Sequence, residues 1–154
     1  MSRATAPGGY LEFQDYGCEI FLSGGTKLEG IIPEHPVSTY MYSTTSAVER
    51  AGHPLTVARG MGERMRKAGF VGVQEQIAIW PYGPWPKQRE LKEIGRWGML
   101  GMIETAYPFA LQLLTREGWT QEQVKELVDA MTDSARRNNY YFQAWFVYGR
   151  KLVT

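Results

Sequence analysis

The stretch from Tyr140 to Tyr148 limits the possible folds of this chain more than any other part of the sequence. Apolar side chains occupy both of its alternating sets, with Tyr140, Phe142, Ala144, Phe146 and Tyr148 in one set and Tyr141, Trp145 and Val147 in the other. A strand that is apolar on both faces is typical of the inside of a sheet. The chain must therefore supply other strands to lie beside it.

Two further segments have the properties of strands. Tyr10 to Tyr16 follows a Pro-Gly-Gly turn and is rich in aromatic and apolar residues. Val71 to Trp80 alternates with a two-residue period, which predicts a strand covered mainly on one face. We expect this second strand to end at a group of prolines, namely Pro81, Pro84 and Pro86.

Helical spacing dominates the remainder, apart from a hairpin-like turn or loop at 23–26 and a region up to His35 that shows no clear period. The predicted helices are Pro36 to Ala51, Val57 to Ala68, Gln88 to about Leu114, and a last helix that starts at a capping box of Thr120 and Gln123 and ends at Asn138. Pro108 predicts a bend in the third helix or its division into two. This order of strands and helices favours a layered α/β domain.

Composition narrows the class of protein. The chain has 154 residues, 44% of them hydrophobic, which suits one domain with a core. A net charge of +1, with positive and negative residues mixed along the chain, gives no electrostatic field that would attract nucleic acid or anionic lipid. Cys18 is the only cysteine, so we expect neither a disulfide nor a metal centre. Neither a signal peptide nor a membrane-spanning run is visible, which predicts a soluble, cytoplasmic protein.

Several segments resemble the C-terminal half of class I S-adenosylmethionine-dependent methyltransferases, of the fungal secondary-metabolism type related to trans-aconitate methyltransferases. Pro7 to Tyr16 resembles the fifth strand and its turn, and Ala68 to Pro81 resembles the sixth. Pro84 to Trp97 is similar to the family's substrate-side loop and helix, and Leu113 to Thr120 with Tyr141 to Lys151 is similar to its last helix start and seventh strand. The resemblance implies a truncated Rossmann-like α/β fold over residues 1–154, with strands in the order five, seven, six and strand seven antiparallel.

The same resemblance implies that the cofactor-binding half of the family is absent, because only six residues precede Pro7. The family holds its cofactor on a glycine-rich turn after its first strand and an acidic residue after its second. Here the only Gly-x-Gly, at Gly60 and Gly62, lies within a helical pattern, so we expect no cofactor. The strand at Tyr10 would also lose a neighbour, which predicts a homodimer that covers its edge.

Candidate site residues come from two places. At the end of the first strand, Asp15 could act as a base, Tyr16 could donate a hydrogen bond as charge develops and Gln14 could hold a carbonyl; surface or capping roles are the alternative. The second place is an aromatic set that could line an apolar cavity or simply form core, and its substrate-binding candidates are Tyr82, Trp85, Trp97, Met102 and Tyr107.

Two further features leave alternatives open. Gly95, Gly98 and Gly101 form a strip without side chains on one helix, against which either another backbone or a ligand could pack. His35 and His53 each adjoin a proline at a helix boundary, where a capping or exposed histidine is usual.

The leading functional hypothesis is a cofactor-independent cyclase or isomerase, a pericyclase of the Diels–Alderase kind, that acts on an apolar intermediate of fungal natural-product biosynthesis. Such a reaction needs a shaped apolar cavity and one or two hydrogen-bond donors. The alternatives are a fragment of a methyltransferase, whose cofactor half comes from a partner chain, and a non-catalytic partner of a full-length methyltransferase.

Overall fold

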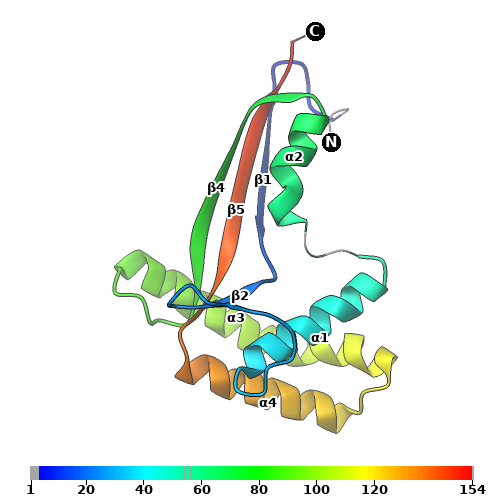
Figure 1. The fold of residues 1–154 in the computed structure, drawn as a ribbon, viewed down its shortest axis with the longest axis vertical. Coiled ribbons are helices and arrows are strands. Elements are labelled where there is room, and N and C mark those ends of the chain that lie inside the picture. Colours follow the sequence, from blue (N-terminus) through cyan, green and yellow to red (C-terminus); the bar gives the residue numbers. More distant parts are fainter. Residues whose placement is uncertain (1–3, 54, 56, 154) are drawn as a thin grey trace. The chain divides into compact units, whose positions relative to one another are not determined.

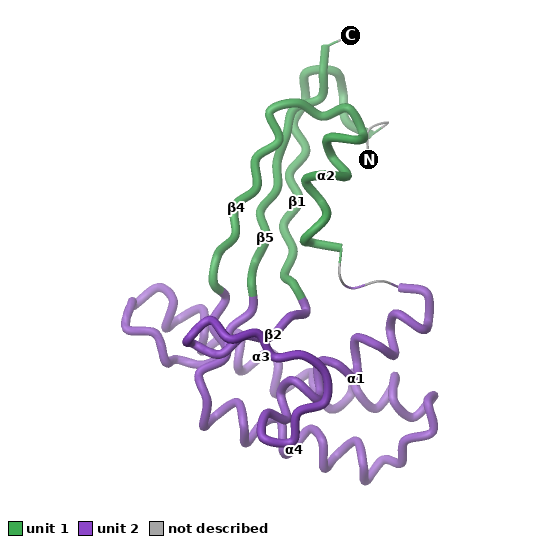
Figure 2. The backbone as a smooth tube through the Cα atoms, viewed as in Figure 1, with its two compact units in different colours: residues 1–17, 56–79, 143–154 green, residues 18–55, 80–142 purple. Residues whose placement is uncertain are grey.

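The computed structural model describes residues 4–53, 55 and 57–153. Figure 1 shows its elements, and Figure 2 divides the chain into two compact units, residues 1–17, 56–79 and 143–154 in the first and 18–55 and 80–142 in the second. The helices and strands, in chain order, are β1 (Tyr10–Tyr16), β2 (Ile20–Leu22), β3 (Lys27–Leu28), α1 (Pro36–Arg50), α2 (Met61–Lys67), β4 (Phe70–Tyr82), α3 (Arg89–Leu114), α4 (Gln121–Arg137) and β5 (Tyr140–Lys151), with single 3-10 turns at Ala58–Gly60 and Thr115–Glu117.

The first unit is a small sheet with one helix on it. β5 pairs with β4 and, antiparallel, with β1, in a register that places Tyr10 opposite Arg150 and Tyr16 opposite Ala144. β5 therefore lies between two strands, as its two apolar sets predicted. The turn before β1 is also confirmed, because Gly8 has a φ of 77° and the N–H of Gly9 donates to the carbonyl of Ala6 at 2.9 Å.

The helix α2 covers one face of this sheet. Its buried Met61 and Met65 form a cluster with Phe70 and Val147, and the side chains of Leu11, Phe13 and Val73 pack against it. α2 is shorter than the helix expected from Val57, since the first turn is 3-10. It reaches only part of the sheet: Ile77 and Ile79, which continue the alternation of Val73 along β4, stay 49% and 48% exposed.

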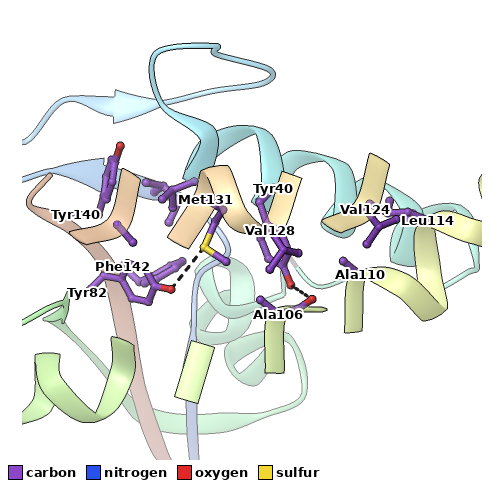
Figure 3. Packing of buried hydrophobic residues seen from close by; sticks show 14 residues of the cluster. Tyr40, Tyr82, Ala106, Ala110, Leu114, Val124, Val128, Met131, Tyr140 and Phe142 are labelled. Carbon is purple, nitrogen blue, oxygen red and sulfur yellow. Dashed lines mark hydrogen bonds between the residues drawn. The ribbon is translucent and has the colours of Figure 1, made fainter. Parts of the chain in front are cut away.

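The second unit is built on α1, α3 and α4, which pack on one another around the main core (Figure 3). The Tyr40 hydroxyl on α1 donates to the Ala106 carbonyl of α3 at 3.0 Å. The ring of Tyr82 lies edge-on to that of Phe142, with 5.9 Å between the ring centroids. The capping box predicted for α4 is present, with the N–H of Gln123 donating to Thr120 Oγ1 at 3.2 Å.

Two segments differ from the sequence expectations, and at Pro108 the structure decides between two alternatives. The hairpin-like turn expected at 23–26 is present, but the two short strands beside it were not predicted: β2 and β3 form the hairpin, and β2 pairs with the start of β5. The strand β4 continues through Pro81 to Tyr82. Proline is tolerated in edge strands, and β4 pairs only with β5 among the described strands. α3 is a single helix with Pro108 inside it.

Pro108 does not divide α3 because both partners in the lost hydrogen bond are at the surface. Proline removes the N–H that would donate to the carbonyl of Glu104, and both residues are exposed, so water can solvate that carbonyl. Among the described residues, no helix combines the length and the apolar character that crossing a lipid bilayer requires.

Candidate functional site

The first group of candidates, Gln14, Asp15 and Tyr16, ends β1 in the first unit. One carboxylate oxygen of Asp15 accepts the N–H of Tyr16 at 2.8 Å, and the side-chain amide of Gln14 donates to Glu12 Oε1 at 2.5 Å. Successive side chains of a strand point to opposite faces. Gln14 and Tyr16 are exposed on one face, whereas half-buried Asp15 lies on the face of Phe13, which α2 covers further along.

This alternation separates the two residues predicted to be catalytic. Asp15 and Tyr16 are neighbours in sequence, but their side chains leave the strand on opposite faces, so they do not converge on one point in the first unit. Gln14 and Tyr16 can share a ligand on the open face. The catalytic roles of Asp15 and Tyr16 and the substrate role of Gln14 stay predictions.

In the second unit, Tyr82 belongs to the main core. Its side chain is 2% exposed, and its hydroxyl lies 3.7 Å from the sulfur of Met131 (Figure 3). Burial raises the pKa of Tyr82 above its ordinary value, and the nearby Tyr40 raises it further. The phenol therefore stays neutral at any physiological pH. A ligand could reach it only if the core opened.

The other substrate-binding candidates lie at different depths. The indole N–H of half-buried Trp85 donates to the Tyr140 carbonyl at 2.9 Å, which fixes the loop before α3 to the start of β5. Met102 and Tyr107 are half-buried and pack against the main core. Trp97 is 70% exposed. The structure therefore does not gather these residues with Tyr82 around one opening, and their substrate roles remain untested.

The glycine strip of α3 has a structural explanation at two of its three positions. A Cβ on Gly95 would lie 2.0 Å from the carbonyl oxygen of Gly83, and one on Gly98 would lie 3.0 Å from the indole nitrogen of Trp80. The alternative that another backbone packs on the strip is thus confirmed at Gly95. At Gly101 a Cβ would meet no atom within 4 Å.

Several large apolar side chains on and beside α3 are exposed. We call this set the α3 surface, and it consists of Ile94, Trp97, Leu100 and Phe109 together with Trp80 of β4, which are between 41% and 70% exposed. The helical spacing of these apolar residues does not show whether their side chains face the core or the solvent. Exposed apolar side chains that lie next to one another are typical of ligand or partner contacts. In the described part of the second unit, the α3 surface is the best candidate for holding an apolar molecule.

His35 has a structural role that its sequence position did not predict. It occupies the N-cap position of α1, yet its ring makes no capping hydrogen bond and instead contacts the Tyr140 hydroxyl through Nδ1 at 2.9 Å. That hydroxyl also lies 2.8 Å from Oγ of Ser134. Burial raises the pKa of Tyr140, and the hydrogen bond to Ser134 opposes this rise. The three side chains tie the start of α1 to the junction of α4 and β5, and His35 lies 105 residues from Tyr140 in sequence.

The Gly-x-Gly of the sequence lies in the first unit, at the start of α2. Gly60 and Gly62 are placed at the start of α2, not in a turn after a strand, as expected. Gly62 is explained by packing, since a Cβ there would lie 2.2 Å from a carboxylate oxygen of Glu75 on β4. Arg66 holds that carboxylate at 3.0 Å. Gly62 therefore serves the contact of helix with sheet. Within the described ranges, no group of three histidine, cysteine or acidic side chains could hold a metal ion.

The chain is similar to several fungal proteins that are named as methyltransferases. No protein-family profile matches the chain. It is 29% identical over 136 residues to "Methyltransferase pytC" of Aspergillus terreus, covering 88% of this chain and 41% of that protein. It is 26% identical over 151 residues to "Probable methyltransferase tdiE" of Emericella nidulans, covering 96% of this chain and 46% of that protein.

A third similarity is more local. The chain is 31% identical over 85 residues to "Protein-methionine methyltransferase laeA" of Chaetomium globosum, which covers 54% of this chain and 27% of that protein. The chain is thus similar to fungal methyltransferases along nearly its whole length. It spans less than half the length of each of these relatives.

Proposed function

We propose that this chain forms the acceptor-substrate part of a fungal S-adenosylmethionine-dependent methyltransferase of secondary metabolism. The observation that carries the proposal is the similarity to proteins named as methyltransferases over 88% and 96% of the chain. The pairing of β5 with both β1 and β4, antiparallel to β1, supports an equivalence of β1, β5 and β4 to strands five, seven and six of the class I fold.

The cofactor site belongs to a different segment under this proposal. Gly62 is used where α2 packs on the sheet, and Gly60 is the N-cap residue of α2, so neither follows a strand as the family's cofactor glycines do. The relatives have more than half of their length outside the matched region, which is enough for a cofactor-binding part. Such a part could be joined to this chain or supplied by a second polypeptide.

This chain would contribute recognition of the acceptor. The α3 surface offers Trp97 and Trp80, whose flat indole rings suit an aromatic or polyketide-like molecule. On β1, Gln14 and Tyr16 add an amide and a phenol on one open face, which can hold carbonyl or hydroxyl groups. Each group acts within its own unit.

Complementation tests the proposal. The part of the Emericella nidulans relative that does not align with this chain would be produced alone and together with this chain. We expect binding of radiolabelled S-adenosylmethionine to the relative's part, and methylation of a panel of small aromatic acceptors only when both parts are present. The variant Trp97→Ala should lower the acceptor's kcat/KM while leaving cofactor binding unchanged. If this chain alone bound the cofactor, or if the mixture never methylated, the proposal would be wrong.

The cofactor-independent cyclase remains a second candidate, and the comparisons give it no support. The feature that favours it is the α3 surface, since a pericyclic reaction needs little beyond an apolar surface that holds a reactive conformer. Incubation of this chain alone with polyene or polyketide intermediates separates the two proposals. Acceleration over the spontaneous reaction, without any cofactor, would favour the cyclase. A non-catalytic partner would instead co-purify with a full-length methyltransferase and show neither activity.

A further inference from the structure

The middle strand of the first unit, β5, has a defined direction for its backbone groups. The N–H of Lys151 donates to the Gly9 carbonyl at 2.8 Å, on the side of β1. The carbonyl of Gln143 accepts the N–H of Gly17 at the same distance of 2.8 Å. The odd-numbered residues of β5 thus turn their backbone groups toward β1. Since these groups alternate along an antiparallel strand, the even-numbered residues turn theirs toward β4.

The contacts between β4 and β5 give the matching alternation in β4, which runs opposite to β5 (Figure 1). A Cβ on Gly149 would lie 2.9 Å from a methyl group of Val73. The Tyr148 hydroxyl donates to Gln74 at 2.7 Å. Odd-numbered residues of β4 therefore lie beside odd-numbered residues of β5. From Val73 onward they turn their backbone groups to the outer edge of β4, where the Arg66 side chain donates to the Val73 carbonyl at 3.4 Å.

Two features limit the open part of this edge. Gly72 has a φ of 58°, and both Phe70 and Val73 contact the α2 cluster although one number is even and the other odd. Such a change of alternation at a glycine is typical of a β-bulge. At the other end, Pro81 has no N–H to donate. The edge is therefore open for regular pairing from Val73 to Ile79.

This edge lies away from the part of the protein that the proposed function assigns to another segment. Under the strand equivalence of that proposal, the neighbour of β1 belongs to the other part, and the homodimer predicted through β1 stays a prediction. β1 and β4 each pair with β5, which lies between them. The other part would thus join the sheet on the side of β1, opposite to the outer edge of β4.

The sequence of the open edge is self-complementary around Glu75. Val-Gln-Glu-Gln-Ile, residues 73–77, has a β-branched apolar residue at each end and a glutamine on either side of its centre. If two copies lay antiparallel about Glu75, Val73 of each would face Ile77 of the other, and Gln74 would face Gln76. Ile77 is 49% exposed, and this pairing would place it beside a second apolar side chain.

The two Glu75 carboxylates would not meet as unpaired charges. Arg66 holds the Glu75 carboxylate of its own copy at 3.0 Å. That carboxylate lies against α2, where a Cβ on Gly62 would come within 2.2 Å of it. Each copy therefore brings an ion pair to the axis, which reduces the repulsion between the two carboxylates.

Neighbouring registers with two-fold symmetry are less favourable. A centre on Gln76 would set Glu75 of each copy opposite Ile77 of the other. A centre on Gln74 would set Glu75 opposite Val73 in the same way. The centre on Glu75 places apolar side chains opposite apolar ones and amides opposite amides.

We propose that a second copy of this chain pairs with the outer edge of β4, antiparallel, on a two-fold axis at Glu75, so that the two sheets join into one. The hydrogen bonds form between the backbone groups of Val73, Glu75 and Ile77. The ladder is short and shares the Val73 carbonyl with Arg66, so we expect a dimer that forms at micromolar concentration. The inference uses the strand equivalence of the proposed function but not its reaction. A failure to methylate would therefore leave it intact, and a monomeric chain would leave the proposed reaction intact.

Disulfide trapping tests the register. In a Cys18→Ser background, Q74C and Q76C variants would be oxidised separately and as an equal mixture. Both glutamines are exposed, so neither change removes a core contact. Their backbone groups turn toward β5, so across the new contact they would form a non-hydrogen-bonded pair, with Cα atoms about 4.5 Å apart and within reach of a disulfide. We expect efficient cross-linking only in the mixture, between the two different variants. Efficient cross-linking of either variant with itself would overturn the proposal, as would the absence of any cross-link.

Sedimentation equilibrium tests the strength of the contact. Ile77→Glu would set a carboxylate opposite Val73 and near Glu75, twice in the dimer, and should raise the dissociation constant about tenfold or more. Ile31→Glu, the same change at a 65% exposed isoleucine of the second unit, should leave it unchanged. Both variants should keep the circular dichroism spectrum of the wild type. Equal weakening by both variants would contradict the proposal. A wild-type chain that is monomeric at high micromolar concentration would refute it, including the case in which another segment covers the edge.

Discussion

Gly95 of α3 offers the sharpest test of the second unit. The methyl carbon of an alanine there would lie 2.0 Å from the Gly83 carbonyl oxygen and 2.8 Å from its carbon, whereas ordinary contacts begin at 3.4 Å. The obstacle is backbone, and the N–H of Gly83 donates back to the Gly95 carbonyl at 3.1 Å. The loop before α3 must therefore move by more than an ångström, with loss of this hydrogen bond.

The expected magnitude follows from two opposing effects. Overpacking of this kind costs about 3 kcal/mol at the upper end of its usual range. Replacement of a helical glycine by alanine returns about 1 kcal/mol of helix propensity. Gly95→Ala should thus lower the free energy of unfolding by about 2 kcal/mol, measured by urea denaturation followed by circular dichroism at 222 nm.

The same helix supplies the control. A methyl group on Gly101 would meet no atom within 4 Å, so Gly101→Ala should gain the propensity term alone, about 1 kcal/mol. If Gly95→Ala were as stable as wild type or more stable, the packing of the Gly83 loop on α3 would be wrong. Equal destabilisation by both variants would also contradict it.

Three other changes test the main core and its connections. Thr120→Ala removes the N-cap of α4 and should cost about 1 kcal/mol in urea denaturation, which Thr120→Ser should largely restore. Tyr140→Phe leaves His35 and Ser134 without a shared partner and should lower the free energy of unfolding by about 2 kcal/mol. A variant as stable as the wild type would contradict this hydrogen-bond network. Burial raises the pKa of Tyr82 in the folded chain, so its neutral phenol favours folding below pH 10. This contribution to stability falls as the pH rises above that value, because the same phenol ionises in the unfolded chain. Tyr82→Phe should therefore lose less stability than wild type between pH 9 and pH 11.5, as followed by thermal denaturation.

Several local features followed directly from the sequence because neighbouring residues decide them. The alternation of Val71 to Trp80 and the two apolar sets of Tyr140 to Tyr148 identified β4 and β5 as strands, and β5 as an interior one. The capping box placed the start of α4 correctly, and the proline at position 36 placed the start of α1. The similarity to fungal methyltransferases was also visible in short motifs of the sequence.

Other features required the tertiary structure because they depend on residues far apart in the chain. The helical spacing of α3 could not show that the apolar side chain of Ile94 is exposed to solvent. Nor could spacing reveal that His35 meets Tyr140, 105 residues away. The hairpin of β2 and β3 lacked a periodic signal because each strand is too short to show one.

The candidate site shows the same division between local and distant information. Sequence alone brought together the residue types that can bind an acceptor, at the end of β1 and on α3. The fold decided that Asp15 and Tyr16 leave the strand on opposite faces and that Tyr82 lies in the core. It also decided that Gly95 and Gly62 make room for the chain's own atoms. The period of a helix or strand is a property of a few adjacent residues, whereas the neighbours of a side chain are set only when distant segments pack together.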